Sequence, residues 1–166
     1  MSVSMFRPVA AAIAVMLCAA PAGAQPQRLE SVAIFHLGEE HLDLDVFRAS
    51  DRSRLGLVSI ENPLRMRGLP TGSVAIGPGR WPALIELWTK ARAAVTGAEP
   101  WTTVGEVQEP GDLSGARLSL SSGPSVRFTI LGPSAAGGIS FELAPADLDA
   151  MGVALAREQK MLGSRN

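Results

Sequence analysis

The sequence predicts an α+β fold of two similar halves, each with four antiparallel strands followed by one helix. The first observation is an internal repeat, because the segments 74–95 and 141–162 carry the same apolar pattern 67 positions apart. Each copy is an alternating apolar stretch, a proline and then apolar residues at helical spacing. The second observation is that shorter strand-like segments, bounded by Gly, Pro, Asn, Asp and Ser, precede each copy.

The matched positions are those that a fold needs for its core. They are Val74, Ile76, Pro78, Trp81, Leu84, Trp88 and Val95 in the first copy, and Phe141, Leu143, Pro145, Leu148, Met151, Leu155 and Leu162 in the second. The repeats extend over about 30–97 and 101–162 within a single α+β domain of residues 25–166. The repeat therefore predicts a duplicated scaffold, and function is expected where the copies differ.

In the first half, strands are expected at 31–35, 42–48, 54–60 and 73–76. Around 42–48 the apolar residues alternate with His41, Asp43 and Asp45, which predicts a half-buried strand with one solvated face. A helix follows, and it begins at Pro78 or one turn later because Pro82 also lies in this region. Its apolar stripe includes both Trp81 and Trp88, which are expected in the core.

In the second half, strands are expected at 102–108, 117–121, 125–131 and 139–143. Gly105 indicates a bulge or a close backbone approach in the first of them. Pro145 is expected to open the last helix, with Asp147 and Asp149 in its first turn, where the helix dipole favours negative charge. Gly152 weakens this helix by up to about 1 kcal/mol relative to alanine.

Residues 1–24 have the features of a signal peptide. Arg7 supplies a positive charge, and 9–20 is an apolar stretch too short to span a bilayer. Small residues at Ala22 and Ala24 predict cleavage after Ala24. The sequence therefore predicts an exported protein, periplasmic or secreted.

The mature part would have 142 of the 166 residues and a net charge near zero. Removal of the leader takes Arg7 from the 15 basic residues and none of the 16 acidic ones, which leaves −2. Cys18 is the single cysteine, and Leu17 before it disfavours a lipid anchor. The mature part would therefore have no disulfide and no thiolate site. No further apolar stretch has the length of a membrane span.

The junction from Gly72 to Leu84 resembles that of the Whirly/PUR group of single-stranded nucleic-acid-binding modules. It has the spacing Gly-x-Val-x-Ile-x-Pro-x-x-Trp-x-x-Leu, and the segment 139–151 resembles it more loosely. The resemblance implies four antiparallel strands and a helix per repeat, with nucleic acid bound on a sheet face rich in basic and aromatic residues. This chain departs from that pattern, because tyrosine is absent and lysine is scarce.

A single-stranded nucleic-acid binder is therefore one alternative function. Its basic residues would be Arg48, Arg52, Arg54, Arg65 and Arg67, which equally suit a solvated rim of hairpin and loop. The near-neutral charge and the predicted export make a nucleic-acid partner unexpected.

A second alternative is a metal-dependent enzyme. The candidate ligands His36, Glu39, Glu40, His41 and Asp43 lie close together in the sequence, and imidazole and carboxylate are common metal ligands. The two histidines are five residues apart and Gly38 indicates a turn, so the spacing matches no compact metal motif. A polar turn between two strands accounts for the same residues.

The main hypothesis is an exported, non-enzymatic binding or protein-interaction module with no cofactor. Motifs for nucleophilic catalysis or phosphate binding are lacking in the sequence. Trp101 follows Pro100 in the linker between the repeats, where a partly exposed tryptophan is a plausible interface anchor. The expected partner is another envelope protein or a second copy of the chain.

Overall fold

The structure is a computed structural model, and it describes residues 26–63, 71–110, 112, 114–132 and 138–164. The predicted signal peptide, Arg65 and Arg67 lie outside these residues. In the described part of the chain, no helix is both long enough and apolar enough to cross a membrane.

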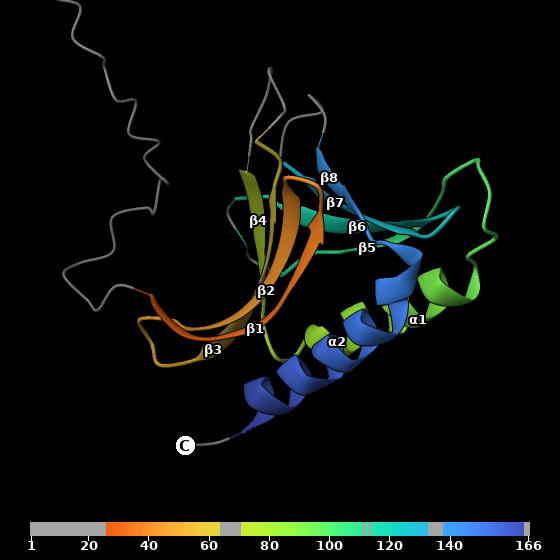
Figure 1. Ribbon diagram of the computed structural model, residues 1–166. Coiled ribbons are helices and arrows are strands. Elements are labelled where there is room, and N and C mark those ends of the chain that lie inside the picture. Colours follow the sequence, from red (N-terminus) through yellow and green to blue (C-terminus); the bar gives the residue numbers. More distant parts are fainter. Residues whose placement is uncertain (1–25, 64–70, 111, 113, 133–137, 165–166) are drawn as a thin grey trace, which may run out of the picture.

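The fold consists of two four-stranded antiparallel sheets and two helices (Figure 1). The first half comprises β1 (Gln27–Leu37), β2 (Glu40–Arg48), β3 (Arg54–Glu61), β4 (Thr71–Ile76) and α1 (Trp81–Ala93). The second comprises β5 (Thr102–Val107), β6 (Arg117–Ser122), β7 (Val126–Leu131), β8 (Ile139–Glu142), the 3-10 turn η1 (Pro145–Asp147) and α2 (Leu148–Gly163). Within each sheet the strands pair in sequence order. The predicted α+β fold of two ββββα halves is confirmed.

Several boundaries differ from the expected ones for local reasons. β1 extends well beyond 31–35, because it pairs with β2 along its whole length. A turn in which the Gly77 carbonyl accepts the N–H groups of Arg80 and Trp81 precedes α1, so Pro78 lies outside the helix. Pro145 opens the 3-10 turn rather than α2 itself. The expected irregularity at Gly105 is present as a register shift between β5 and β6.

Each helix packs chiefly on the sheet of the other half. α1 contacts β5 and β6, whereas α2 contacts β1, β2 and β3. On α1, the Trp88 ring stacks on Phe128 of β7 at 5.9 Å between ring centroids. The Ser122 hydroxyl of β6 donates a hydrogen bond of 2.6 Å to the Ala91 carbonyl. The two halves therefore share one core.

Trp81 connects the two halves at the first turn of α1. Its side chain is fully buried, and its indole N–H donates a 3.0 Å hydrogen bond to the Leu155 carbonyl of α2. The indole ring lies directly on Gly56 of β3, where any β-carbon would clash with the ring. Glycine at position 56 therefore permits the close approach of helix and sheet.

The shared core makes the folding of each half depend on the other. A fragment of residues 26–97 lacks α2, the helix that covers β1, β2 and β3, and so exposes the apolar core face of its sheet. We expect this fragment to show no cooperative thermal unfolding as a monomer by circular dichroism. The intact chain should unfold in one transition. If the fragment folds cooperatively as a monomer, its sheet does not need α2, and the dependence of each half on the helix of the other would be contradicted.

Candidate functional site

The histidine-rich turn brings some, but not all, of the candidate metal ligands together. His36 and His41 face each other across the β1–β2 hairpin, whose turn includes Gly38 with φ of 64°. Their ring centroids are 5.8 Å apart. His41 Nε2 lies 3.1 Å from a carboxylate oxygen of Glu61 and 3.8 Å from one of Asp43. Glu61, which the sequence analysis did not include, lies opposite His41 on β3.

The two glutamates of the turn lie apart from this group. Glu39 is exposed, and the Glu40 carboxylate accepts a 2.6 Å hydrogen bond from the side-chain amide of Asn62. Partial burial raises the pKa of Asp43, although the nearby His41 acts in the opposite direction. Within the described residues, no three His, Cys, Asp or Glu side chains are grouped so that they could hold a metal ion. The arrangement is a polar network on the outer face of the first sheet.

Asp45 corrects the expectation of a solvated face on β2. Only 6% of this residue is exposed, and its carboxylate pairs with the Arg28 guanidinium at 2.5 Å. Arg28 belongs to β1, whose extension beyond the expected strand covers this position. Burial of this carboxylate is compatible with folding because the ion pair supplies a charged hydrogen-bond partner.

Three of the five candidate arginines lie at the β2–β3 hairpin. Arg48 and Arg54 form a cross-strand pair, and Arg52 is exposed in the turn with φ of 69°. The Arg54 guanidinium donates hydrogen bonds to the Met161 carbonyl and the Ser164 hydroxyl at the end of α2. Arg54 thus caps the last turn of a helix, as cations at a helix C-terminus commonly do.

Trp101 is half-buried and in contact with its own chain. The Arg127 guanidinium lies over the indole ring, 3.9 Å from the ring centroid. Gly123 approaches the same ring so closely that a β-carbon there would lie 3.1 Å from it. Arg127 also pairs with Glu142 at 2.6 Å. Trp101 therefore holds the linker against the second sheet.

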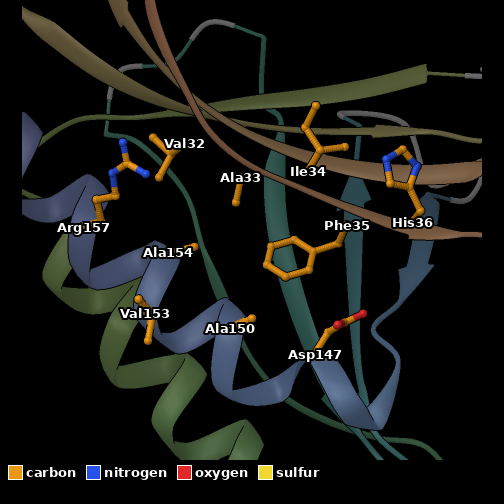
Figure 2. A pocket seen from close by; sticks show the side chains of 10 residues that line it. All are labelled: Val32, Ala33, Ile34, Phe35, His36, Asp147, Ala150, Val153, Ala154 and Arg157. Carbon is orange, nitrogen blue, oxygen red and sulfur yellow. The ribbon is translucent and has the colours of Figure 1, made fainter.

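A groove lies between the unpaired edge of β1 and α2 (Figure 2). Its volume is about 680 Å³. One wall is the strand segment from Val32 to His36. The other wall comprises Asp147, the last residue of η1, and Ala150, Val153, Ala154 and Arg157 of α2.

Among the described residues, the large exposed apolar side chains lie in or next to this groove. Three large apolar residues are exposed in the described part of the chain: Ile34 at 50%, Leu37 at 42% and Val153 at 70%. Ile34 and Val153 line the groove, and Leu37 ends the same strand. β1 is also an edge strand, since among the described strands only β2 pairs with it. An exposed edge of this kind presents backbone N–H and C=O groups for pairing with another strand.

The two ends of the groove carry opposite charges. Arg157 lies at the Val32 end, where it also pairs with Glu30, and Asp147 lies at the end of Phe35 and His36 (Figure 2). Acidic residues are expected at the N-terminal end of α2 because of the helix dipole. The groove therefore presents a negative end at Asp147, an apolar centre and a positive end at the exposed guanidinium of Arg157, where the Glu30 carboxylate offsets part of the positive charge.

A buried carboxyl lies on the core-facing side of α2. Glu158 is fully buried, and neither carboxyl oxygen has a hydrogen-bond partner. A β-carbon at Gly56 would lie 2.6 Å from one of these oxygens. Burial, with a smaller contribution from the charge of Asp45, raises the pKa of Glu158 to about 9. At neutral pH this carboxyl is protonated, and it lies in the core rather than in the groove.

Sequence reasoning missed the groove because its walls come from opposite ends of the chain. Two signals were present: Val153 interrupts the polar face of the last helix, and the segment 32–35 is apolar without alternation. Glu158 was missed because glutamate in a helix is ordinarily solvated. Its position on the same helical face as Met151, Leu155 and Leu162 was the available signal.

Glu158 makes stability depend on pH. The folded state holds a proton on this carboxyl up to pH of about 9, whereas the unfolded chain releases it near the ordinary value of 4.5. The free energy of unfolding should therefore fall as pH rises between these values, by up to about 1.4 kcal/mol per pH unit. Glu158→Gln, which mimics the neutral acid, should abolish this decrease.

Urea unfolding of wild type and Glu158→Gln at several pH values measures the difference. Subtracting the unfolding free energy of the variant from that of wild type at each pH removes the contributions of the other titrating groups. A difference that does not change with pH would contradict the protonated state of Glu158.

Comparisons with known proteins do not assign this chain to a family. A scan against protein-family models matches no family, and a search of curated proteins finds no match. The structure itself is therefore the basis for a functional proposal.

Proposed function

We propose that the protein is an exported, non-enzymatic interaction module that binds an extended segment of a partner protein in the β1–α2 groove. The observation that carries the proposal is the coincidence of an unpaired edge strand with the exposed Ile34 and Val153. The segment would add to β1 as a further strand, so that backbone hydrogen bonds supply affinity and side-chain contacts supply specificity. The exported location rests on the signal-peptide pattern of residues 1–24.

Edge strands of soluble proteins are normally protected against such pairing. Lysine, proline or a bulge at the exposed edge is the usual means. From Ala33 to Leu37, β1 has no such residue, and its pairing with β2 is regular over this stretch. The β5 edge of the second sheet differs in its side chains, since the exposed residues at its start are Thr102 and Thr103, whereas β1 exposes Ile34 and Leu37; both strands have register shifts, and those of β1 lie before Ala33. This contrast favours β1 as the binding edge.

The charges of the groove define the chemistry of the bound segment. A strand that adds antiparallel to β1 begins beside His36 and Asp147 and ends beside Val32 and Arg157. Complementary charges then require a basic residue near its N-terminus and an acidic residue near its C-terminus. Small β-branched residues between them suit the apolar centre.

The outer face of the first sheet supports the nucleic-acid alternative less well. Asp43 and Glu61 give that face acidic groups, whereas binding of a phosphate backbone needs clustered cations. Arg48 and Arg52 lie at one hairpin, which is a small basic area. The groove is therefore better suited to hold a partner than the outer sheet face.

A labelled peptide tests the proposed binding mode directly. The probe is a fluorescein-labelled strand of alternating Thr and Val with Lys at the N-terminal end and Glu at the C-terminal end. Fluorescence anisotropy should show saturable binding to the intact chain, and Ile34→Lys or Val153→Asp should weaken it by at least about tenfold. Both substitutions are at exposed positions, so the fold should persist.

Two controls make the result specific. Thr102→Lys, on the edge strand β5 of the second sheet, should leave the peptide affinity unchanged. A peptide with Lys and Glu exchanged should bind more weakly, since its charges oppose those of Asp147 and Arg157. Equal binding by wild type and the groove variants would refute the proposal.

A further inference from the structure

We propose that the segment bound in the β1–α2 groove is β1 of a second copy of this chain, which produces a dimer with two-fold symmetry. This inference rests on the proposed function of the groove and specifies its partner. The reason is that two copies of the groove, related by a two-fold axis, match each other in charge, in strand pairing and in apolar surface.

Charge complementarity follows from the polarity of α2. A two-fold axis through the centre of the groove places the negative end of one copy against the positive end of the other. Asp147 of each copy then faces Arg157 of the second copy. The Arg157 side chain is 56% exposed even though it pairs with Glu30, so it is accessible to another carboxylate.

Strand pairing is compatible with this axis. Two-fold symmetry perpendicular to a sheet brings identical strands together antiparallel, which continues the antiparallel pairing of β1 with β2. Directly opposed residues of antiparallel strands have side chains on the same face of the sheet, and the axis passes midway between one residue and its copy. Ile34 is the natural centre, because it is exposed and lies in the middle of the groove wall. Phe35 of each copy then opposes Ala33 of the other.

Apolar contact would form on both faces of the new strand pair. Successive residues of a strand point to opposite faces, and Ile34 pairs in register with Asp43 of the outer face, away from the helices. Ile34 would therefore meet its copy on the outer face. On the inner face, Val153 protrudes from α2 between Asp147 and Arg157, and the symmetry brings the two helices together antiparallel at this residue.

A second copy also explains why an unprotected edge is tolerated. In a two-fold contact each copy uses the same edge, so the interaction closes after two chains. The dimer would have one continuous eight-stranded sheet formed from the two first sheets. Neither copy would then retain an unpaired β1 edge for further association.

The first experiment measures the oligomeric state of the intact chain by sedimentation equilibrium from low to high micromolar concentration. We expect a reversible dimer, with Ile34→Lys and Val153→Asp raising its dissociation constant by at least about tenfold. Thr102→Lys should dimerise as wild type does. Thermal melts of every variant show whether the fold is retained. A wild type that remains monomeric, or folded groove variants that dimerise normally, would overturn the inference.

A charge exchange tests the symmetry itself. Asp147→Arg alone places two guanidinium groups together at each end of the contact, and Arg157→Asp alone places two carboxylates together. Each variant should dimerise at least about tenfold more weakly than wild type. An equimolar mixture should form a heterodimer, in which one end pairs the original Asp147 with the original Arg157 and the other end pairs the two substituted side chains. Folded variants that fail to associate on mixing would refute the two-fold arrangement.

Disulfide formation locates the axis. In a chain with Cys18→Ser, Ile34→Cys should give an oxidised dimer, because residues opposed across antiparallel strands lie within disulfide range. Thr102→Cys is the matched control, and equally efficient cross-linking of this control would count against the proposed axis. The peptide titration separates the two proposals: peptide binding by a chain that never dimerises would refute only the dimer, and absence of both would refute both.

Discussion

The contact of Trp81 with Gly56 and Leu155 is the interaction on which the rest of the structure depends. It lies where the first turn of α1 meets β3 of its own half and α2 of the other half. The indole N–H satisfies a buried carbonyl, and the ring occupies space that any side chain at position 56 would fill. From this point α1 continues onto the second sheet while α2 crosses to the first.

The packing of α2 on the first sheet also forms the candidate site. β1 begins the described chain and α2 ends it, so the groove has walls from the two halves. α2 presents two distinct faces. Met151, Leu155 and Glu158 are buried against the core, whereas Val153 and Arg157 remain exposed beside β1. The helix therefore covers the first sheet, and an apolar groove remains between its exposed side and the edge strand β1 (Figure 2).

Much of the fold follows from local patterns in the sequence. Alternation predicted strands near their observed places, and the spacing of Trp81, Leu84 and Trp88 predicted the buried face of α1. The site was less predictable. His36 and His41 do approach each other across a hairpin, but Glu61 joins them from β3 instead of Glu39 or Glu40. Strand register, which a single sequence does not specify, decides that choice.

The sequence by itself determined the order of the elements, the apolar face of each helix and the duplicated plan, because these depend on periodicity within short segments. Only the tertiary structure decided which sheet each helix covers, since both sheets offer an apolar face of the same kind. The tertiary structure also explains Gly152. A β-carbon at this position would lie 3.3 Å from Nε1 of Trp88, so glycine allows α2 to approach the indole ring closely. The burial of Glu158 and the groove beside Ile34 are likewise tertiary, because each is formed by residues far apart in the chain.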